Sequence, residues 1–175
     1  MPTPALSQVR GMADLSALYR WELIFAEFPA AVAGFDTNDL NLRCESIELP
    51  KRTVTPTEIF LHGHKHTRAG RSEVPGTLTF TFIETVDAKV LSFIKAWRDA
   101  IWAFDSGVQV PYADYIATVE IHHHNQNNDA FWRYVLKGVW LEDYEGGGQP
   151  DGQTGDPLKP TLTLHYDDFE DNAIT

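Results

Sequence analysis

A long polar segment between Pro50 and Gly76 places the strongest constraint on what this chain can fold into. It is rich in β-branched residues and carries histidine and basic residues around Gly63. Loops longer than about 12 to 15 residues are uncommon in compact domains, and the β-branched content argues against disorder. A two-stranded extension without a core of its own is only marginally stable in water. The segment therefore predicts an arm that another chain covers, and the chain is predicted to be a subunit.

Length and composition favour a single domain spanning residues 1–175. A hydrophobic content of 43% and an aromatic content of 12% can fill one sizeable core. Within this domain we expect a flexible N-terminus at residues 1–18, the inter-subunit arm at residues 51–75 and a flexible loop at residues 146–157. No apolar run approaches the roughly 20 residues that cross a bilayer, and the first residues lack a signal-peptide pattern. We therefore expect no membrane association and a product that stays in the compartment where it is made.

The formal charge of −11 is unevenly distributed. Residues 139–175 hold nine acidic residues and one lysine, a net charge of 1 − 9 = −8. Residues 43–71 hold six basic and three acidic residues, a net charge of 6 − 3 = +3. A basic arm and an acidic tail can attract their counterparts on neighbouring copies. Tight nucleic-acid binding is disfavoured because the whole molecule repels polyanions.

Alternation of apolar and polar residues predicts six strands outside the arm. They are Tyr19–Phe28, Leu40–Leu49, Thr77–Ile83, Tyr115–His123, Phe131–Asp143 and the last strand, Pro160–Tyr166. Pro29–Asp39 is expected to be a loop, and residues 125–129 a hairpin turn. The predicted fold is mainly β (α+β): an antiparallel β-barrel or sandwich with one packed α-helix and a protruding β-arm.

That helix is predicted from apolar residues at three- and four-residue spacing. The stripe consists of Val90, Ile94, Trp97, Ile101 and Phe104. Asp87 is the expected N-cap and Gly107 the expected C-terminal cap.

Histidines raise the possibility of a metal site. His62, His64 and His66 alternate, so on one strand they would share a face, and His122, His123 and His124 are consecutive. However, Gly63 interrupts the first set, and neither set has an HExxH motif or a cysteine partner. Solvated histidines are the favoured interpretation, and we expect no metal or other cofactor.

The other enzymatic patterns are weak. Asp167, Asp168, Glu170 and Asp171 are close to the C-terminus and typical of a solvated face rather than of a hydrolytic pair. Cys44 is the single cysteine, which excludes an intrachain disulfide, and its place in a strand favours buried packing. The glycines at 146–148 lack the residues of a phosphate loop. The sequence predicts no catalytic residues and no enzyme activity.

Tryptophans leave a binding module open as an alternative. Trp97, Trp102, Trp132 and Trp140 could form a carbohydrate platform on a soluble β-sandwich. Trp97 lies on the apolar stripe of the helix, which favours core packing, whereas Trp102 lies off that stripe and is a candidate subunit contact. A histidine-rich metalloenzyme is the third possibility.

The order of these elements resembles the tail tube proteins of contractile phage tails, including the tubes of R-type pyocins and type VI secretion systems. The stretches that carry the resemblance are Leu42–Pro50, Gly76–Phe82, Phe93–Trp97, Trp132–Trp140 and Leu158–Leu164. They cover most of the chain from Tyr19 to Phe169. None of them is a catalytic signature, so the resemblance rests on the ensemble.

The resemblance implies a structural virion protein that forms hexameric rings stacked into a hollow tube inside a contractile sheath. Implied partners are further copies of the chain and the tail sheath, baseplate, tape-measure and tail terminator proteins, while DNA passes through the lumen without specific binding. The implied location is the virion tail, assembled in the host cytoplasm. The arm would join neighbouring subunits or rings. Its candidate inter-subunit residues are Lys51, Arg52, Thr57, Ile59, Leu61, Lys65, Arg68 and Arg71.

Overall fold

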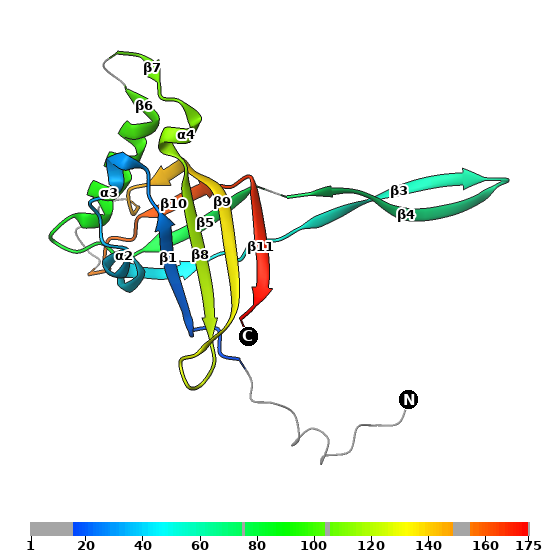
Figure 1. Cartoon of the computed structure of the whole chain (residues 1–175), viewed down its shortest axis with the longest axis horizontal. Coiled ribbons are helices and arrows are strands. Elements are labelled where there is room, and N and C mark those ends of the chain that lie inside the picture. The colour runs from blue at the N-terminus through cyan, green and yellow to red at the C-terminus, as the bar shows by residue number, and fades with distance from the viewer. Residues whose placement is uncertain (1–15, 75, 104–105, 149–154, 175) are drawn as a thin grey trace.

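A computed structural model of the chain describes residues 16–74, 76–103, 106–148 and 155–174. It shows a β-rich body from which one hairpin projects (Figure 1). The content of 50% strand and 18% helix confirms the predicted mainly β fold. The strands are β1 (Trp21–Glu27), β2 (Cys44–Ile47), β3 (Thr53–Leu61), β4 (His64–Glu73), β5 (Thr77–Phe82), β6 (Trp102–Ala103), β7 (Val108–Gln109), β8 (Ala117–His124), β9 (Ala130–Glu145), β10 (Thr161–His165) and β11 (Asp168–Ala173). The helices are the 3₁₀ turn η1 (Ala30–Val32), α2 (Thr37–Arg43), α3 (Lys89–Ile101) and α4 (Tyr112–Tyr115).

Seven antiparallel strands form two sheets that share β9. The path runs β1-β8-β9-β10-β5-β2, and β11 also pairs with β9. Residues 132–137 of β9 pair with β11, and residues 140–145 pair with β10. We call β1-β8-β9-β11 the front sheet and β9-β10-β5-β2 the rear sheet.

The bend of β9 between the two sheets lies at Gly138. Lys137, the residue before it, pairs with the front sheet, and Trp140 pairs with the rear sheet. Gly138 has φ +64°, a conformation that side chains rarely adopt. Nearby, the Tyr112 hydroxyl donates a hydrogen bond to the Asp167 carboxylate, which raises the pKa of Tyr112 to about 12.

We expect Gly138→Ala to destabilise the body. A Cβ at this position would meet the Asp167 carboxylate and lie 2.6 Å from the Tyr112 hydroxyl oxygen. The left-handed backbone and the disturbed hydrogen bond together should lower the free energy of unfolding by about 2–4 kcal/mol. Urea denaturation measures this loss. Gly34→Ala is the matched control, because nothing lies within 4 Å of its Cβ position. Equal free energies of unfolding for the two variants would show that the bend of β9 does not require glycine at position 138.

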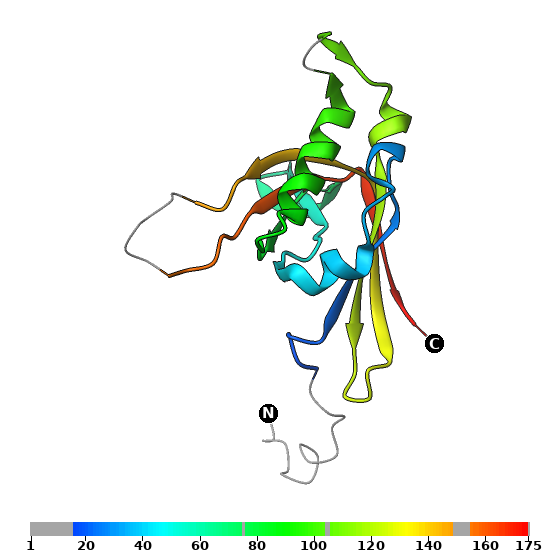
Figure 2. The same ribbon diagram turned by 90° about the vertical axis from the view of Figure 1, so that its left-hand side faces the viewer.

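The core lies between the two sheets and under α3. Apolar residues that alternate along the strands are buried here, among them Leu23 and Phe25 of β1 and Leu78, Phe80 and Phe82 of β5. The core is completed by α3, and Figures 1 and 2 show α2 and α3 on the side of the body opposite the projecting hairpin. No helix within the described ranges is long and apolar enough to cross a membrane.

Trp97 is the largest fully buried side chain and connects α3 to the rest of the core. Its indole nitrogen donates a hydrogen bond to the Tyr115 carbonyl oxygen at 2.9 Å. Its ring lies 5.5 Å from Phe93 and 6.2 Å from Phe25, measured between ring centroids. The prediction that Trp97 packs in the core is confirmed.

The predicted helix exists, but both of its predicted caps are wrong. The N-cap is Ala88, and the Glu84 carboxylate accepts the Leu91 backbone N–H at 2.7 Å. Asp87 instead forms an ion pair with Arg43 at 2.9 Å. The helix ends at Ile101, and Gly107 follows in the turn between β6 and β7. Phe104 lies outside the described residues.

Residues 37–43 form a helix where a loop and the start of a strand were predicted. Asp36 caps this helix α2, because its carboxylate accepts the Asn38 N–H at 3.0 Å. Asp39 and Arg43 add an ion pair at 3.2 Å across one turn. Leu42, which belongs to the predicted strand Leu40–Leu49, is 84% exposed in this helix. The strand is therefore confined to β2, where Cys44 is buried as predicted.

Two further boundaries differ from the prediction. Tyr115 belongs to α4, so the predicted strand from Tyr115 begins at Ala117 instead. The strand at 160–166 is not the last one, since β11 follows and pairs with β9 over Phe169 and its neighbours. Residues 1–15 of the expected flexible N-terminus and residues 149–154 of the expected loop at 146–157 lie outside the described residues.

Candidate assembly surfaces

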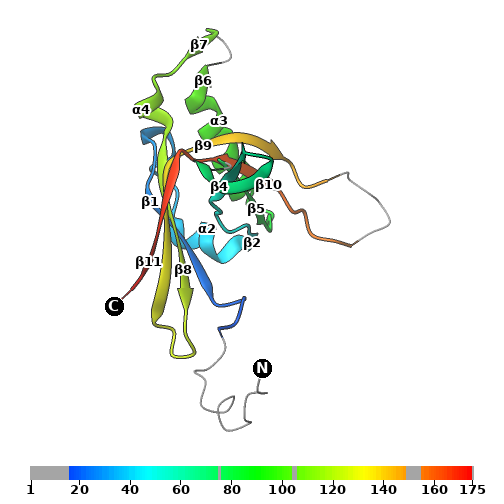
Figure 3. The same ribbon diagram turned by 90° about the vertical axis from the view of Figure 1, so that its right-hand side faces the viewer.

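The predicted arm is a hairpin of β3 and β4 that stands away from the body in Figure 1 and points toward the viewer in Figure 3. A two-residue turn, His62-Gly63, joins its strands with φ +49° and +83°, as type I′ hairpin turns require. At about 3.3 Å per residue, strands of this length extend roughly 30 Å. Apart from Ile59, every residue of the two strands is exposed.

Cross-strand pairing gives the arm two different faces. One face carries the pairs Thr57/Arg68, Ile59/His66 and Leu61/His64. The other carries Glu58/Thr67 and Phe60/Lys65. Phe60 was not among the predicted inter-subunit residues, although its side chain is 68% exposed. A large aromatic residue beside a polar turn is the sequence signal that could have identified it.

The predicted inter-subunit residues divide between these faces and the base of the arm. Thr57, Ile59, Leu61 and Arg68 lie together on one face, whereas Lys65 lies on the other and forms an ion pair with Glu58. Arg71 is exposed on β4, nearer the base. Lys51 and Arg52 precede β3.

Arg52 fastens the base of the arm to β11. Its guanidinium donates hydrogen bonds to the Asp168 carboxylate at 2.9 Å and to the Phe169 carbonyl oxygen at 3.1 Å. It also lies 5.1 Å from the centre of the Phe169 ring. The basic arm and the acidic tail therefore meet within one chain at this point.

The front sheet ends in two open edges. Across the described ranges, β1 and β11 each pair with one strand only, β8 and β9 respectively. Open edges present unpaired backbone groups and favour pairing with another chain. They lie on opposite sides of the sheet (Figure 1).

The face of the front sheet that points away from the core is predominantly acidic. Strand registers place these charged residues on it: Glu22, Glu27, Glu120, Asp168, Glu170, Arg133 and Lys137. With five acidic and two basic residues, the face has a formal charge of 2 − 5 = −3 when histidines are neutral. His122 and the Lys137–Glu170 ion pair lie on this same face.

The histidine sets do not converge on one point. His62 lies in the hairpin turn, so it does not continue the strand face of His64 and His66 as predicted. His122 contacts Glu120 at 2.8 Å, and His124 contacts Glu22 at 3.4 Å. His123 belongs to the opposite face, and burial lowers its pKa. Among the described residues, no three histidine, cysteine, aspartate or glutamate side chains are grouped to hold a metal ion.

The tryptophans are also dispersed. Trp97 is buried, and Trp102 is 41% exposed in β6. Trp132 lies in the front-sheet half of β9 near Tyr134, whereas Trp140 lies in the rear-sheet half against His165. These positions do not form the continuous platform that a carbohydrate module would need. The contact role considered for Trp102 stays a prediction.

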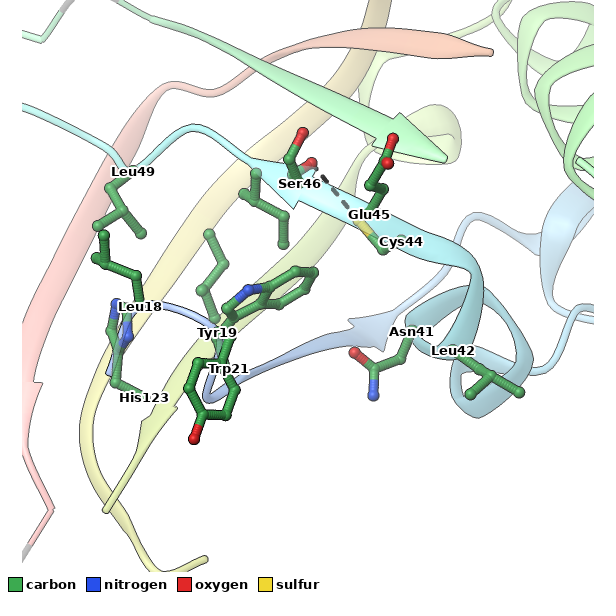
Figure 4. A pocket seen from close by; sticks show the side chains of 12 residues that line it. Leu18, Tyr19, Trp21, Asn41, Leu42, Cys44, Glu45, Ser46, Leu49 and His123 are labelled. Carbon is green, nitrogen blue, oxygen red and sulfur yellow. Dashed lines mark hydrogen bonds between the residues drawn. The ribbon is translucent and has the colours of Figure 1, made fainter. Parts of the chain in front are cut away.

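An open groove of about 740 Å³ lies between β1 and β2, the two end strands of the sheet path (Figure 4). Its lining is largely apolar and includes Trp21, Ile47 and Ile121. Leu18 and Leu42, which also line it, are 86% and 84% exposed. The groove could not be predicted from the sequence, because the segments that line it are distant in the chain.

Cys44 lines the groove, and burial raises the pKa of its thiol to about 12. The thiolate is the reactive form. In dilute protein we expect alkylation to be slow near pH 8 and to accelerate about tenfold per pH unit up to about pH 11. A rate that levels off near pH 9 would show an ordinary thiol. Protein unfolded in urea is the control and should show that ordinary profile.

Comparisons with known proteins agree with this geometry. Together, the open-edged sheet and the protruding hairpin are typical of a protein that assembles with further chains. The model of the phage tail tube protein family matches residues 20–140, and the chain belongs to this family. The resemblance recognised in the sequence is thereby confirmed. No curated protein sequence matches the chain.

Solved structures show the same fold at low identity. The cap that terminates the tube of the anti-feeding prophage matches with a TM-score of 0.70 and 11% identity, covering 94% of this chain and 95% of that one. A chain from the sheath–tube complex of the extracellular contractile injection system PVC matches with a TM-score of 0.64 and 12% identity, covering 98% and 100%. A chain from the anti-feeding prophage baseplate matches with a TM-score of 0.63 and 16% identity, covering 92% and 97%.

Proposed function

We propose that this protein is the structural subunit of a hollow tail tube in a contractile particle, with six copies closing into each ring. The observation that carries the proposal is the front sheet, which has one face in the core, one charged face and an open edge on either side. Pairing β11 of one copy with β1 of the next satisfies both edges. The same pairing repeated around six copies leaves no edge open.

Such a ring would be a continuous barrel of 4 × 6 = 24 strands, since four strands form the front sheet. With strand spacing of about 4.8 Å and ordinary strand tilt, its backbone diameter is roughly 40–50 Å. The acidic face of the front sheet lines the lumen in this arrangement. It contributes 6 × −3 = −18 per ring, which disfavours binding of DNA phosphates during passage.

The arm joins copies to one another in this proposal, within or between rings. The tail sheath, baseplate, tape-measure and tail terminator proteins are the proposed partners, and the virion tail, assembled in the host cytoplasm, is the proposed location. Sheath–tube and baseplate assemblies contain chains of the same fold, which supports these partners. A single non-enzymatic domain without a cofactor is sufficient for this role.

Electron microscopy of the purified protein tests the function. We expect six-fold rings or tubes that appear as protein concentration rises. A persistent monomer with saturable binding of an oligosaccharide would instead support the carbohydrate-binding module.

A further inference from the structure

We propose that the groove between β1 and β2 is the docking site for the arm of the adjacent copy in the same ring. This inference rests on the proposed ring closure and specifies one contact within it. It assigns a partner surface to the exposed apolar residues on both the groove and the arm.

The groove has the character of an unfilled interface. It presents apolar side chains of Trp21, Ile47 and Leu49 together with the highly exposed Leu18 and Leu42. Apolar surface of this kind on a soluble protein marks a contact site. The hairpin likewise leaves Val54, Phe60 and Leu61 at least half exposed, with Phe60 and Leu61 on opposite faces of its tip.

The arm cannot fill the groove of its own chain. Arg52 holds the arm base against Asp168 and Phe169 of β11, at one edge of the front sheet. The groove adjoins β1, at the other edge, and the arm points away from it (Figure 1). Three strand spacings, about 14 Å, separate the two edges. An arm that fills this groove therefore has to come from a second copy.

Ring closure brings the two surfaces together. When β11 of one copy pairs with β1 of the next, the first copy's arm emerges beside the second copy's groove. The arm extends in the direction of that neighbour, and its roughly 30 Å length exceeds the width of a four-stranded sheet. The contact is head-to-tail, so it repeats around a closed ring.

Charge is complementary across this contact. Glu45 lines the groove, where Lys159 pairs with its carboxylate at 2.6 Å, and the exposed Glu48 lies between the lining residues Ile47 and Leu49. The arm presents basic side chains, including the exposed Arg68 and Arg71. Opposite potentials of this kind steer and orient an association whose affinity comes from apolar burial.

A thiol reporter in the groove tests the proposal. Ser46 lines the groove and is exposed, so Ser46→Cys in a Cys44→Ser background gives one reactive thiol there. We expect its alkylation to slow at least tenfold in assembled rings relative to dilute monomer. Adding Phe60→Ser and Leu61→Ser should restore most of the reactivity in rings of the same size. Val86→Ser, an exposed apolar change away from both surfaces, is the control that should keep protection.

Cross-linking covers the case in which the arm variant fails to assemble. A second thiol placed by Val54→Cys, Phe60→Cys or Leu61→Cys should join the reporter of a neighbouring copy through a short bifunctional maleimide. Rings whose reporter stays as reactive as in the monomer, without cross-links, would overturn the inference and leave the ring itself intact. The thiol reporter could also be protected from alkylation at every protein concentration and in the arm variants. That result would assign the groove to the chain's own residues 1–15 and would also overturn the inference. Failure of the wild-type protein to form any ring would instead refute the proposed function.

Discussion

Deletion of Thr53–Arg71 is expected to leave a folded body that no longer forms long tubes. Within the part of the chain that the structure describes, the two strands of the hairpin pair only with each other. Apart from Ile59 their residues are exposed, so their loss removes no core. Thr53 pairs with Glu73, which brings the cut ends close enough to join. Circular dichroism should show a cooperative unfolding transition near that of the intact chain, while electron microscopy should show no extended tubes.

The matched control keeps the arm and changes its charges. Glu58→Gln with Lys65→Gln removes the ion pair at the tip without changing net charge. Because an exposed ion pair contributes at most about 1 kcal/mol, tubes should still form. Normal polymerisation of the deletion variant would show that the arm has no role in assembly.

Trp97→Ala should have the largest effect of any single substitution on stability. The side chain is fully buried, and its indole N–H donates a hydrogen bond to the Tyr115 carbonyl oxygen. Truncating a buried tryptophan costs about 3–5 kcal/mol. Urea denaturation of the arm-deleted body in dilute solution measures the loss of unfolding free energy.

Trp102→Ala is the control for this substitution, because Trp102 follows directly after α3 as the first residue of β6 but is 41% exposed. We expect it to cost less than about 1 kcal/mol. Similar losses at the two positions would mean that the helix does not depend on the buried contact.

The features that could be predicted from the sequence are those with strong local patterns. The alternation in Thr77–Phe82, the stripe of α3 and the turn residues at the arm tip each specify their structure over consecutive residues. The arm itself was predicted because a long β-branched segment had no apolar face to bury. Its candidate residues were therefore identified as a group, although the structure divides them between two faces.

The features that were missed depend on partners distant in the sequence. β11 contains one buried apolar residue, Phe169, and forms because β9 supplies its backbone partners. The short helix α2 buries only Leu40, so it has no apolar stripe that the sequence could show. The alternation across residues 40–49 predicted a strand, and this pattern was stronger than the helix signal from the Asp36 cap. The groove requires β1 and β2 to be the two ends of one sheet path, which no local signal specifies.

Edge-to-edge closure of the front sheet is the central claim, and disulfide scanning across that junction tests it most directly. In a Cys44→Ser background, one cysteine replaces Glu22 or Ile24 of β1 and another replaces Asp168, Glu170 or Asn172 of β11, all on the charged face. We predict that at least one pair oxidises into a covalent ladder ending at six copies. Rings or tubes that form normally while every pair stays unlinked would contradict the account.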